Sequence, residues 1–442
     1  MKLHDRVKSD VALPTRASVV VIGAGIIGIA TALELAERGI DVVVVEKGEV
    51  AGEQSSRNWG WCRQMGRDPR EIPLILESLR LWRGMNARVN GETGFKQCGV
   101  IYLAETEKQL NDSEHWLRNF GQPSGIPSRM VSGKDVDALL PGGTKSWAGG
   151  MYTINDGRAE PFIAVPALAR ALQHLGGKIF TQCAARGIEM AGGRVAAVVT
   201  ERGRITTDSA VLAGGYWSRR FLGNLGIRFP QLGVISSVLR TSPLDAGIDR
   251  TFSGGKAAVR KRLDGGFTLA HNVLSVADIT PASFVHFRDF LPIMRMEQKS
   301  IRLRLGRRFI EEARLKRHWA LDEASPFEQV RILDPEPVMP LLDDAFGYLK
   351  SVFPVFEKSS VVETWAGVID ATPDAVPVIG KIDAVSGLHL ASGFSGHGFG
   401  IGPGAGKLMA QIVTGETPCV DIAPFRFSRF SDGSRPQPTT GL

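Results

Sequence analysis

Val19-Val20-Val21-Ile22-Gly23-Ala24-Gly25-Ile26-Ile27-Gly28 is the stretch of sequence that decides the fold of this 442-residue chain. Its four consecutive β-branched residues predict a strand buried on both faces, and the three glycines follow with the spacing G-x-G-x-x-G. The next apolar residues predict a helix that ends at Gly39. In such a unit Gly23 permits a tight turn, Gly25 lets a pyrophosphate approach the backbone, and Gly28 lets the helix pack closely on the strand.

A second buried strand follows at Asp41-Val42-Val43-Val44-Val45-Glu46. Glu46, 18 positions after Gly28, is placed to bind the hydroxyls of an adenosine ribose, with Lys47 directly after it. A carboxylate there disfavours a 2′-phosphate and therefore NADP. Strand, glycine turn, helix and acid-ending strand form one βαβ unit, which predicts an α/β fold with a doubly wound, Rossmann-like sheet. The motif alone fits either FAD or NAD.

Composition and other motifs narrow the class of protein. The four cysteines lie far apart, which argues against a metal site or a disulfide framework and fits a reducing cytoplasm. The apolar stretch 19–35 contains three glycines, Thr31 and Glu34, so the dinucleotide pattern explains it better than a bilayer does. The residues before it lack the layout of a signal peptide, and we expect a cytoplasmic protein. No G-x-S-x-G, H-E-x-x-H or Walker motif supports a hydrolase or a phosphotransferase.

The net charge of +7 is concentrated in one segment, 288–317, where ten lysines and arginines face four acids. Apolar residues recur within it at roughly helical spacing, which predicts a helical insertion over 284–320. One interpretation is an exposed basic surface for anionic lipid at the inner face of a membrane, for an acidic partner or for an acidic substrate. The other is an insertion whose apolar stripe packs on the parent domain. No pattern of aromatic residues accompanies the charge, so nucleic acid is not expected.

The C-terminal region distinguishes FAD from NAD. A short apolar strand near 387–392 runs into the glycine-dense loop Gly393-Phe394-Ser395-Gly396-His397-Gly398-Phe399, and a helix follows. Such a loop presents backbone N–H groups and a helix N-terminus to an electron-rich group. A reduced flavin carries negative charge near N1 and O2, so this loop favours FAD.

Several motifs together resemble the D-amino acid oxidase superfamily of FAD-dependent oxidoreductases, in particular its glycine oxidase and sarcosine oxidase-like branches. The loop 393–399 is similar to the sarcosine oxidase-type flavin loop, and 372–380 matches the signature T-P-D-x-x-P-x-x-G. Gly157 to Pro161, Ala213 to Ser218 and Gly52 to Arg57 resemble three further family segments. The resemblance implies oxidation of a small amine or amino acid by hydride transfer to flavin N5, giving an imine that water hydrolyses.

The resemblance also implies how the chain is organised. A discontinuous FAD-binding domain is expected from 15–85, 150–225 and 360–425, and a mixed-sheet α+β substrate domain from 86–149 and 226–359, with a flexible tail at 433–442. Because no cysteine lies where some relatives link the flavin covalently, FAD is expected to bind noncovalently. The expected cofactor-binding residues are Gly23, Gly25, Ile26, Ile27, Gly28, Glu46, Lys47, Gly52, Ser55, Ser56, Arg57, Ala185, Ala213, Gly214, Trp217, Gly393, Phe394, Ser395, Gly396, His397, Gly398 and Phe399.

Two familiar carboxylate anchors of these branches are absent, because Ile369 stands in place of an arginine and Gly400 in place of a lysine. Arg63 is the candidate replacement, with Arg57 and Arg67 in the same segment as alternatives. His271 and Asp370 are further pocket candidates, although a structural histidine and a turn-forming aspartate are equally ordinary interpretations.

Two alternative functions remain open at this point. One is a nicotinamide-dependent dehydrogenase, and the other is a flavoprotein subunit that mainly binds partners. For the leading hypothesis, oxygen, a quinone or an electron-transfer protein would reoxidise the flavin.

Overall fold

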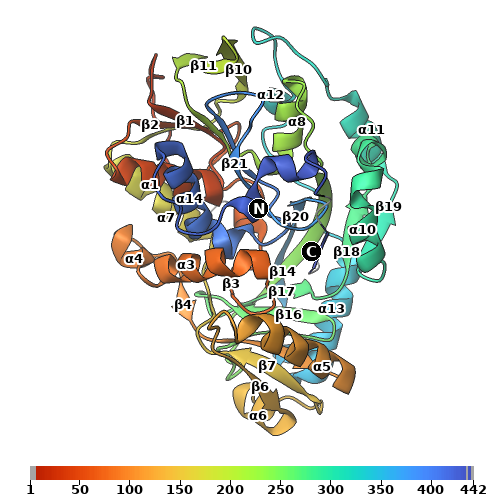
Figure 1. Ribbon diagram of the computed structural model, residues 1–442. Helices are drawn as coiled ribbons and strands as arrows, with labels where there is room; N and C mark the ends of the chain where they lie inside the picture. Colours follow the sequence, from red (N-terminus) through yellow and green to blue (C-terminus); the bar gives the residue numbers. More distant parts are fainter. Residues whose placement is uncertain (1–5, 435–436, 440–442) are drawn as a thin grey trace.

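The computed structural model describes residues 6–434 and 437–439 (Figure 1). One sheet has the strand order β21-β22-β13-β1-β2-β9, and its neighbouring strands are parallel except for β21 with β22. Its strands are β1 (Val19–Ile22), β2 (Val42–Val45), β9 (Lys178–Phe180), β13 (Ala210–Leu212), β21 (Val378–Lys381) and β22 (Leu388–Ser392). The α/β fold with a doubly wound dinucleotide-type sheet is thereby confirmed.

The side chains of β1 and β2 are buried on both faces of the sheet. Successive side chains of a strand point to opposite faces, so each strand contributes to two cores. Val19 and Val21 pack into a core shared with α1 (Ile26–Glu37), α7 (Pro161–His174) and α14 (Gly398–Thr414). Val20 and Ile22 pack on the other side, against a small antiparallel sheet. Its strands are β10 (Ala185–Ala191), β11 (Arg194–Thr200) and β12 (Gly203–Thr206).

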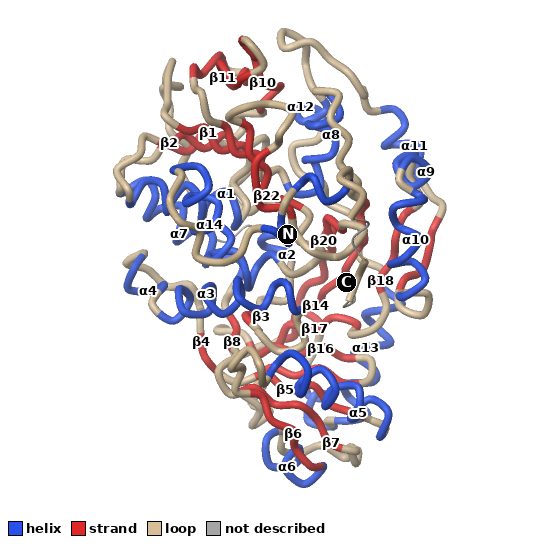
Figure 2. The backbone as a smooth tube through the Cα atoms, viewed as in Figure 1, coloured by secondary structure: helices blue, strands red, loops and turns tan. Residues whose placement is uncertain are grey.

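A second sheet, called the large sheet below, has the order β19-β18-β14-β17-β16-β15-β5-β7-β6, with β20 paired to β14 (Figure 2). Its strands are β5 (Val100–Ala104), β6 (Ser128–Ser132), β7 (Gly149–Thr153), β14 (Leu232–Thr241), β15 (Thr251–Gly254), β16 (Ala257–Lys261), β17 (Phe267–His271), β18 (Ser275–Asp278), β19 (Ile301–Arg304) and β20 (Val361–Ala371). A second small sheet joins β3 (Trp61–Cys62), β8 (Gly157–Arg158) and β4 (Lys96–Gln97).

The remaining helices lie around these sheets (Figure 1). They are α2 (Gln54–Arg57), α3 (Ile72–Arg83), α4 (Met85–Arg88), α5 (Glu107–Trp116), α6 (Gly133–Leu139), α8 (Ser218–Asn224), α9 (Pro281–Val285), α10 (Phe287–Met296), α11 (Arg307–Arg314), α12 (Pro326–Gln329) and α13 (Met339–Val352).

The two predicted domains exchange strands. β20 and most of β7 belong to the large sheet, although both fall inside ranges expected for the FAD-binding domain. The reason is that β20 pairs with β14 from Val361 to Ala371, while Trp365 and Ala366 near its middle bond to Arg57 on the dinucleotide side. β20 therefore connects the large sheet directly to the FAD side of the molecule.

The basic segment is not helical throughout, in contrast to the helical insertion that the spacing of its apolar residues predicted. Ile301–Arg304 forms β19, which extends the large sheet by pairing in parallel with β18. Phe290 and Ile293 of α10 are buried against Val234 and Ala375, so part of the apolar stripe does pack on the parent domain. Other apolar side chains of the segment stay on the surface, namely Phe284, Val285, Phe287, Met296, Leu303, Leu305 and Ile310.

The end of the chain also lies partly outside what is described, since residues 435–436 and 440–442 of the predicted flexible tail are not among the described residues. In the described part, the carbonyl of Gln437 accepts a hydrogen bond from Arg70 (3.1 Å) and the hydroxyl of Thr439 donates to Asp68. No helix within the described residues is long and apolar enough to cross a membrane.

The contact between α1 and α14 is close enough to require glycine. A Cβ atom on Gly406 would lie 2.5 Å from the Cβ of Ala30 and 2.6 Å from its carbonyl carbon. A Cβ atom on Gly402 would lie 2.8 Å from the side chain of Ile26. The two helices therefore meet nearly backbone to backbone.

We predict that Gly406→Ala destabilises the protein by about 1–3 kcal/mol, because a methyl group must push two packed helices apart. Gly347 in α13 is the matched control, since nothing lies within 4 Å of the place that a methyl group would take there. Gly347→Ala should stabilise the protein by roughly 0.5–1 kcal/mol through helix propensity. Thermal unfolding followed by circular dichroism tests both. Equal midpoints for the two variants would contradict the close contact.

Candidate functional site

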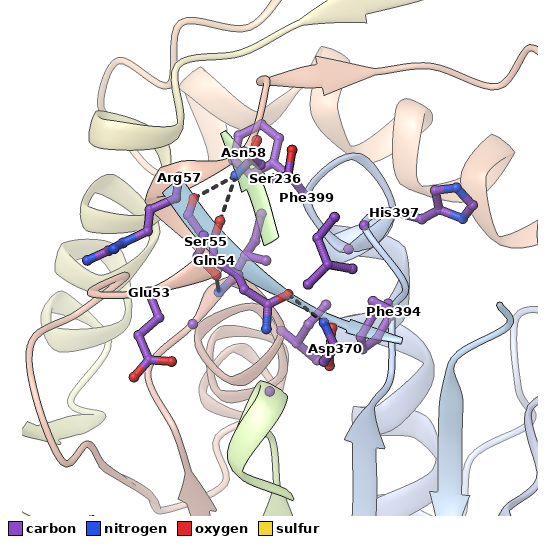
Figure 3. A pocket seen from close by; sticks show the side chains of 18 of the residues that line it. Glu53, Gln54, Ser55, Arg57, Asn58, Ser236, Asp370, Phe394, His397 and Phe399 are labelled. Carbon is purple, nitrogen blue, oxygen red and sulfur yellow. Dashed lines mark hydrogen bonds between the residues drawn. The ribbon is translucent and has the colours of Figure 1, made fainter. Parts of the chain in front are cut away.

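A cavity of about 460 Å³ runs between the dinucleotide-type sheet and the large sheet. Its wall includes the β1–α1 turn, α2, the first turn of α14 and the inner ends of several strands of the large sheet. Figure 3 shows α2 residues such as Gln54 and Ser55 near Asp370 and Phe394, which come from the far end of the chain. The cavity therefore collects residues from across the whole sequence.

The β1–α1 turn and the start of α1 line this cavity. Gly23 has φ +107°, and a Cβ atom there would lie 2.5 Å from the carbonyl oxygen of Ala213. A Cβ atom on Gly28 would lie 2.0 Å from the carbonyl oxygen of Gly23. At the start of α1 the N–H of Ile26 donates to Ser55 Oγ (2.9 Å), and the helix has no side-chain cap from its own N-cap residue. A helix N-terminus of this kind binds phosphate oxygens.

Glu46 is held in place by two backbone N–H groups. Its Oε2 accepts from Ala24 (2.8 Å) and its Oε1 accepts from Gly48 (2.7 Å). Burial raises the pKa of Glu46, and the neighbouring Lys47 partly offsets this. Each carboxylate oxygen keeps a further lone pair, and the residue lines the cavity. This arrangement suits a ribose diol.

The glycine-dense loop reaches the same cavity from the other end. Gly393 N–H donates to Asp370 Oδ2 (2.7 Å), and Thr372 N–H donates to Ser395 Oγ (3.1 Å). His397 then begins α14, which has no side-chain cap hydrogen bond. The first turn of α14 lines the cavity, so a second helix N-terminus faces it. These residues fit FAD, with the pyrophosphate at the N-terminus of α1 and the flavin at that of α14.

Most predicted cofactor-binding residues line the cavity, and four do not: Gly28, Ser56, Gly393 and Ser395. Gly28 gives close packing, and Ser56 donates to the carbonyl of Glu53 (3.3 Å). Gly393 and Ser395 hold the glycine-dense loop in place through their hydrogen bonds with Asp370 and Thr372. Arg57 lines the cavity, but its guanidinium is engaged by the carbonyls of Ala366 and Gly52 and by Asp334.

Lys47 and Trp217 meet at one carboxylate on the adenosine side. Lys47 Nζ donates to Glu53 Oε1 (2.6 Å), and Trp217 Nε1 donates to the same oxygen (3.0 Å). Lys47 also donates to the carbonyls of Val330 (3.0 Å) and Arg331 (2.8 Å). Lys47 therefore ties the segment after the insertion to this end of the cavity.

His271 and Asp370 line the cavity, and each also binds backbone N–H groups of the protein. The Nδ1 of His271 accepts the N–H groups of Val273 (3.1 Å) and Leu274 (2.9 Å), and its Nε2 lies 3.4 Å from Asp344. Oδ2 of Asp370 accepts from Gly393 and from Ser392 Oγ (3.3 Å), and burial raises the pKa of Asp370 to about 6. Each side chain thus holds a loop of the protein while it lines the cavity.

Arg63 keeps most of its guanidinium free for a ligand. Its Nη1 donates to the carbonyl of Met65, and its guanidinium carbon lies 5.5 Å from the ring centre of Tyr102. Within the described residues, no protein acceptor bonds its Nε or Nη2. Arg63 and Tyr102 both line the cavity.

Arg67, which the sequence suggested only as an alternative, lies beside Arg63. It donates through Nε to the carbonyl of Arg63 (3.1 Å), and its Nη1 lies 3.5 Å from Glu71. Burial, with the charge of Arg63, lowers the pKa of Arg67 to about 10. Its Nη2 lies 3.3 Å from the position of a Cβ atom on Gly400. A buried arginine thus lies beside Gly400, the position where the resemblance to the family predicted a lysine, and the glycine there was the available signal.

Other wall residues carried no signal in the sequence. Ser236, Ser253 and Asn272 line the large-sheet side of the cavity, and Glu297 and Ile301 line it from the insertion. They become neighbours only through strand pairing. No group of histidines, cysteines and acids that could hold a metal ion is found within 6–434 and 437–439.

Comparison with known proteins identifies the family. The profile described as "DAO: FAD dependent oxidoreductase" matches residues 18–412. Among curated proteins, the glycine oxidase of Pseudomonas aeruginosa is 27% identical over 92% of this chain and 97% of its own length. Mouse mitochondrial sarcosine dehydrogenase is 25% identical over 95% of this chain, which spans only 42% of that protein.

Solved structures give a stronger match. L-amino acid deaminase from Proteus myxofaciens, in complex with anthranilate, has a TM-score of 0.93 and 36% identity. The alignment covers 97% of this chain and 96% of that one. L-amino acid deaminase from Proteus vulgaris has a TM-score of 0.92 and 33% identity, over 96% of this chain and 100% of that one.

We predict that Glu46→Gln weakens FAD binding by about 10- to 100-fold, because the amide cannot replace charged hydrogen bonds to the ribose and to two N–H groups. Glu49→Gln is the matched control, since Glu49 does not line the cavity. Flavin retained through gel filtration, read from its absorption, measures the effect. Full retention by Glu46→Gln would show that Glu46 does not bind the cofactor.

Proposed function

The protein belongs to the DAO family of FAD-dependent oxidoreductases, and from that premise we propose that it oxidatively deaminates an L-α-amino acid. The Arg63–Arg67 turn, beside the N-terminus of α14 in the same cavity, is the observation that carries this proposal. The 36% identity to an L-amino acid deaminase supports the same substrate class. The nicotinamide alternative is set aside by the family, whose members use FAD.

The substrate carboxylate is the group that the two arginines suit. A guanidinium donates two parallel hydrogen bonds to a carboxylate, and Arg63 keeps free N–H groups for this. Anthranilate, which is bound in the Proteus myxofaciens enzyme, carries a carboxylate and an amine, as an amino acid does. Trp59, Trp61 and Tyr102 line the cavity nearby and offer apolar surface to a substrate side chain.

The reaction removes two electrons from the Cα–N bond. FAD, when bound, supplies a hydride acceptor at N5. The residues of this chain orient the substrate, so that its Cα–H faces the isoalloxazine side of the cavity while its carboxylate stays on the arginines. Loss of the Cα hydride and an N–H proton leaves an imine, and water then releases ammonia and a 2-oxo acid. No dedicated side-chain base is required, because an unprotonated amine starts the reaction.

Paired substrates test the proposal. We predict that L-phenylalanine bleaches the flavin anaerobically, whereas phenethylamine, which lacks only the carboxylate, bleaches it at least about 100-fold less efficiently. Arg63→Ala should raise KM for L-phenylalanine with a smaller change in kcat, because uniform binding is lost. The same assay in air, with detection of peroxide, distinguishes oxygen from a quinone or an electron-transfer protein as acceptor. Equal bleaching by both compounds would exclude a site that recognises the substrate carboxylate.

We also propose that the insertion, residues 284–320, holds the protein against the inner face of an anionic membrane. Phe284 and Leu305 are each 70% exposed, and Phe287, Leu303 and Ile310 lie exposed in the same segment. Figure 1 places α10, α11 and β19 together along one side of the molecule, and Figure 2 shows α9 beside α11. Exposed apolar side chains among basic ones favour an anionic bilayer surface. A flavoprotein that mainly binds partners remains the alternative only if no substrate is found.

Vesicle binding tests the membrane proposal. We predict cosedimentation with phosphatidylglycerol vesicles that weakens with salt, and little with phosphatidylcholine vesicles. Phe284→Ser combined with Leu305→Ser should abolish it. Leu263→Ser is the matched control, because Leu263 is 60% exposed but lies outside the insertion. Equal binding to both vesicle types, or to neither, would overturn the proposal.

A further inference from the structure

We propose that Asp156 is a positioning residue that keeps the Arg63–Arg67 turn in the shape that binds a substrate carboxylate. This inference rests on the proposed function and names how that site is built. Asp156 lies between β7 and β8 and is fully buried. It is not among the residues that line the cavity, so it acts on the substrate only through other residues.

Asp156 holds the two backbone N–H groups that follow Arg63. Its Oδ1 accepts from Gln64 (2.8 Å), and its Oδ2 accepts from Met65 (3.3 Å). Its own carbonyl accepts from Gly99 (2.9 Å), which fixes the aspartate relative to the large sheet. The carboxylate therefore bridges the sheet and the turn.

The rest of the turn is closed by the arginines themselves. Arg63 donates to the carbonyl of Met65, and Arg67 donates to the carbonyl of Arg63 (3.1 Å). Trp116 Nε1 donates to the carbonyl of Arg67 (2.9 Å). The carbonyls of Met65, Arg63 and Arg67 thus accept hydrogen bonds from the turn itself and from α5. The N–H groups of Gln64 and Met65 instead donate to Asp156. Without that carboxylate, two buried donors between the arginines lose their partners.

The charges around Asp156 make a test by pH possible. Arg63, Arg67, Tyr102 and Cys62 are the ionisable groups that face it. Burial raises the pKa of Asp156 to about 7, against its hydrogen bonds and the charge of Arg63. Tyr102 and Cys62 stay neutral near pH 7, since burial raises the pKa of each.

Protonation of Asp156 has two opposite consequences for a bound carboxylate. A neutral carboxyl group cannot accept both N–H groups, so the turn loosens and binding weakens as pH falls. A purely electrostatic role predicts the reverse, because a neutral Asp156 leaves the two arginine charges less compensated. The direction of the pH trend therefore distinguishes positioning from charge balance.

The experiment measures the Kd of anthranilate for the FAD-loaded enzyme through the change in flavin absorption. We expect Asp156→Asn to raise this Kd about tenfold, as one charge-assisted hydrogen bond is lost and one donor faces an amide. KM for an amino acid should rise with it, while kcat changes less. Asp249→Asn is the matched control, because Asp249 pairs with Arg158 of β8 and does not line the cavity.

The wild-type enzyme gives a second measurement that does not depend on a variant folding. Its Kd for anthranilate should rise several-fold from pH 8 to pH 6 and stay flat across that range in Asp156→Asn. A Kd that falls as the pH is lowered, or a variant with wild-type Kd, would overturn the inference. If Arg63→Ala leaves the Kd unchanged, the proposed function fails instead. If Arg63→Ala raises the Kd and Asp156→Asn does not, only the role of Asp156 is wrong.

Discussion

The close contact between α1 and α14 is the constraint on which the site depends. Glycines at 402 and 406 let α14 lie against Ile26 and Ala30 of α1. Two helices from opposite ends of the chain are therefore packed side by side. Both N-termini consequently open on the same cavity. The dinucleotide turn and the flavin loop, which are 370 positions apart at Gly23 and Gly393, become two halves of one binding surface.

Buried carboxylates shape this surface by holding backbone N–H groups. Glu46 fixes the β1–α1 turn, Asp370 fixes the start of the flavin loop, and Asp156 fixes the arginine turn. Glu312 of the insertion binds side chains instead, since it accepts a hydrogen bond from the hydroxyl of Tyr216 (2.7 Å) and pairs with Arg219. Burying each charge is costly, so such groups persist where they determine the shape of a loop.

The sequence predicted what depends on local pattern and missed what depends on distant pairing. The βαβ unit and the flavin loop follow from β-branched runs and glycine spacing, which neighbouring residues determine. The sequence did not predict β19, because its apolar residues have helical spacing and its strand conformation comes from pairing with β18. Asp156 lies 92 positions from Gln64, and no motif connects them. His271 and Asp370 have suitable chemistry, but contacts that the sequence does not reveal already engage Nδ1 of His271 and Oδ2 of Asp370.

The strand exchange between the two sheets has a consequence for synthesis on the ribosome. β1 and β2 emerge early, but β22 and α14 complete their sheet and their core only near residue 414. The N-terminal part cannot fold as a finished unit while the chain is still growing, so it must wait for its partner segments. Cofactor binding then requires α14 to have been made. A bound flavin reports that both halves of the binding surface have been made and assembled.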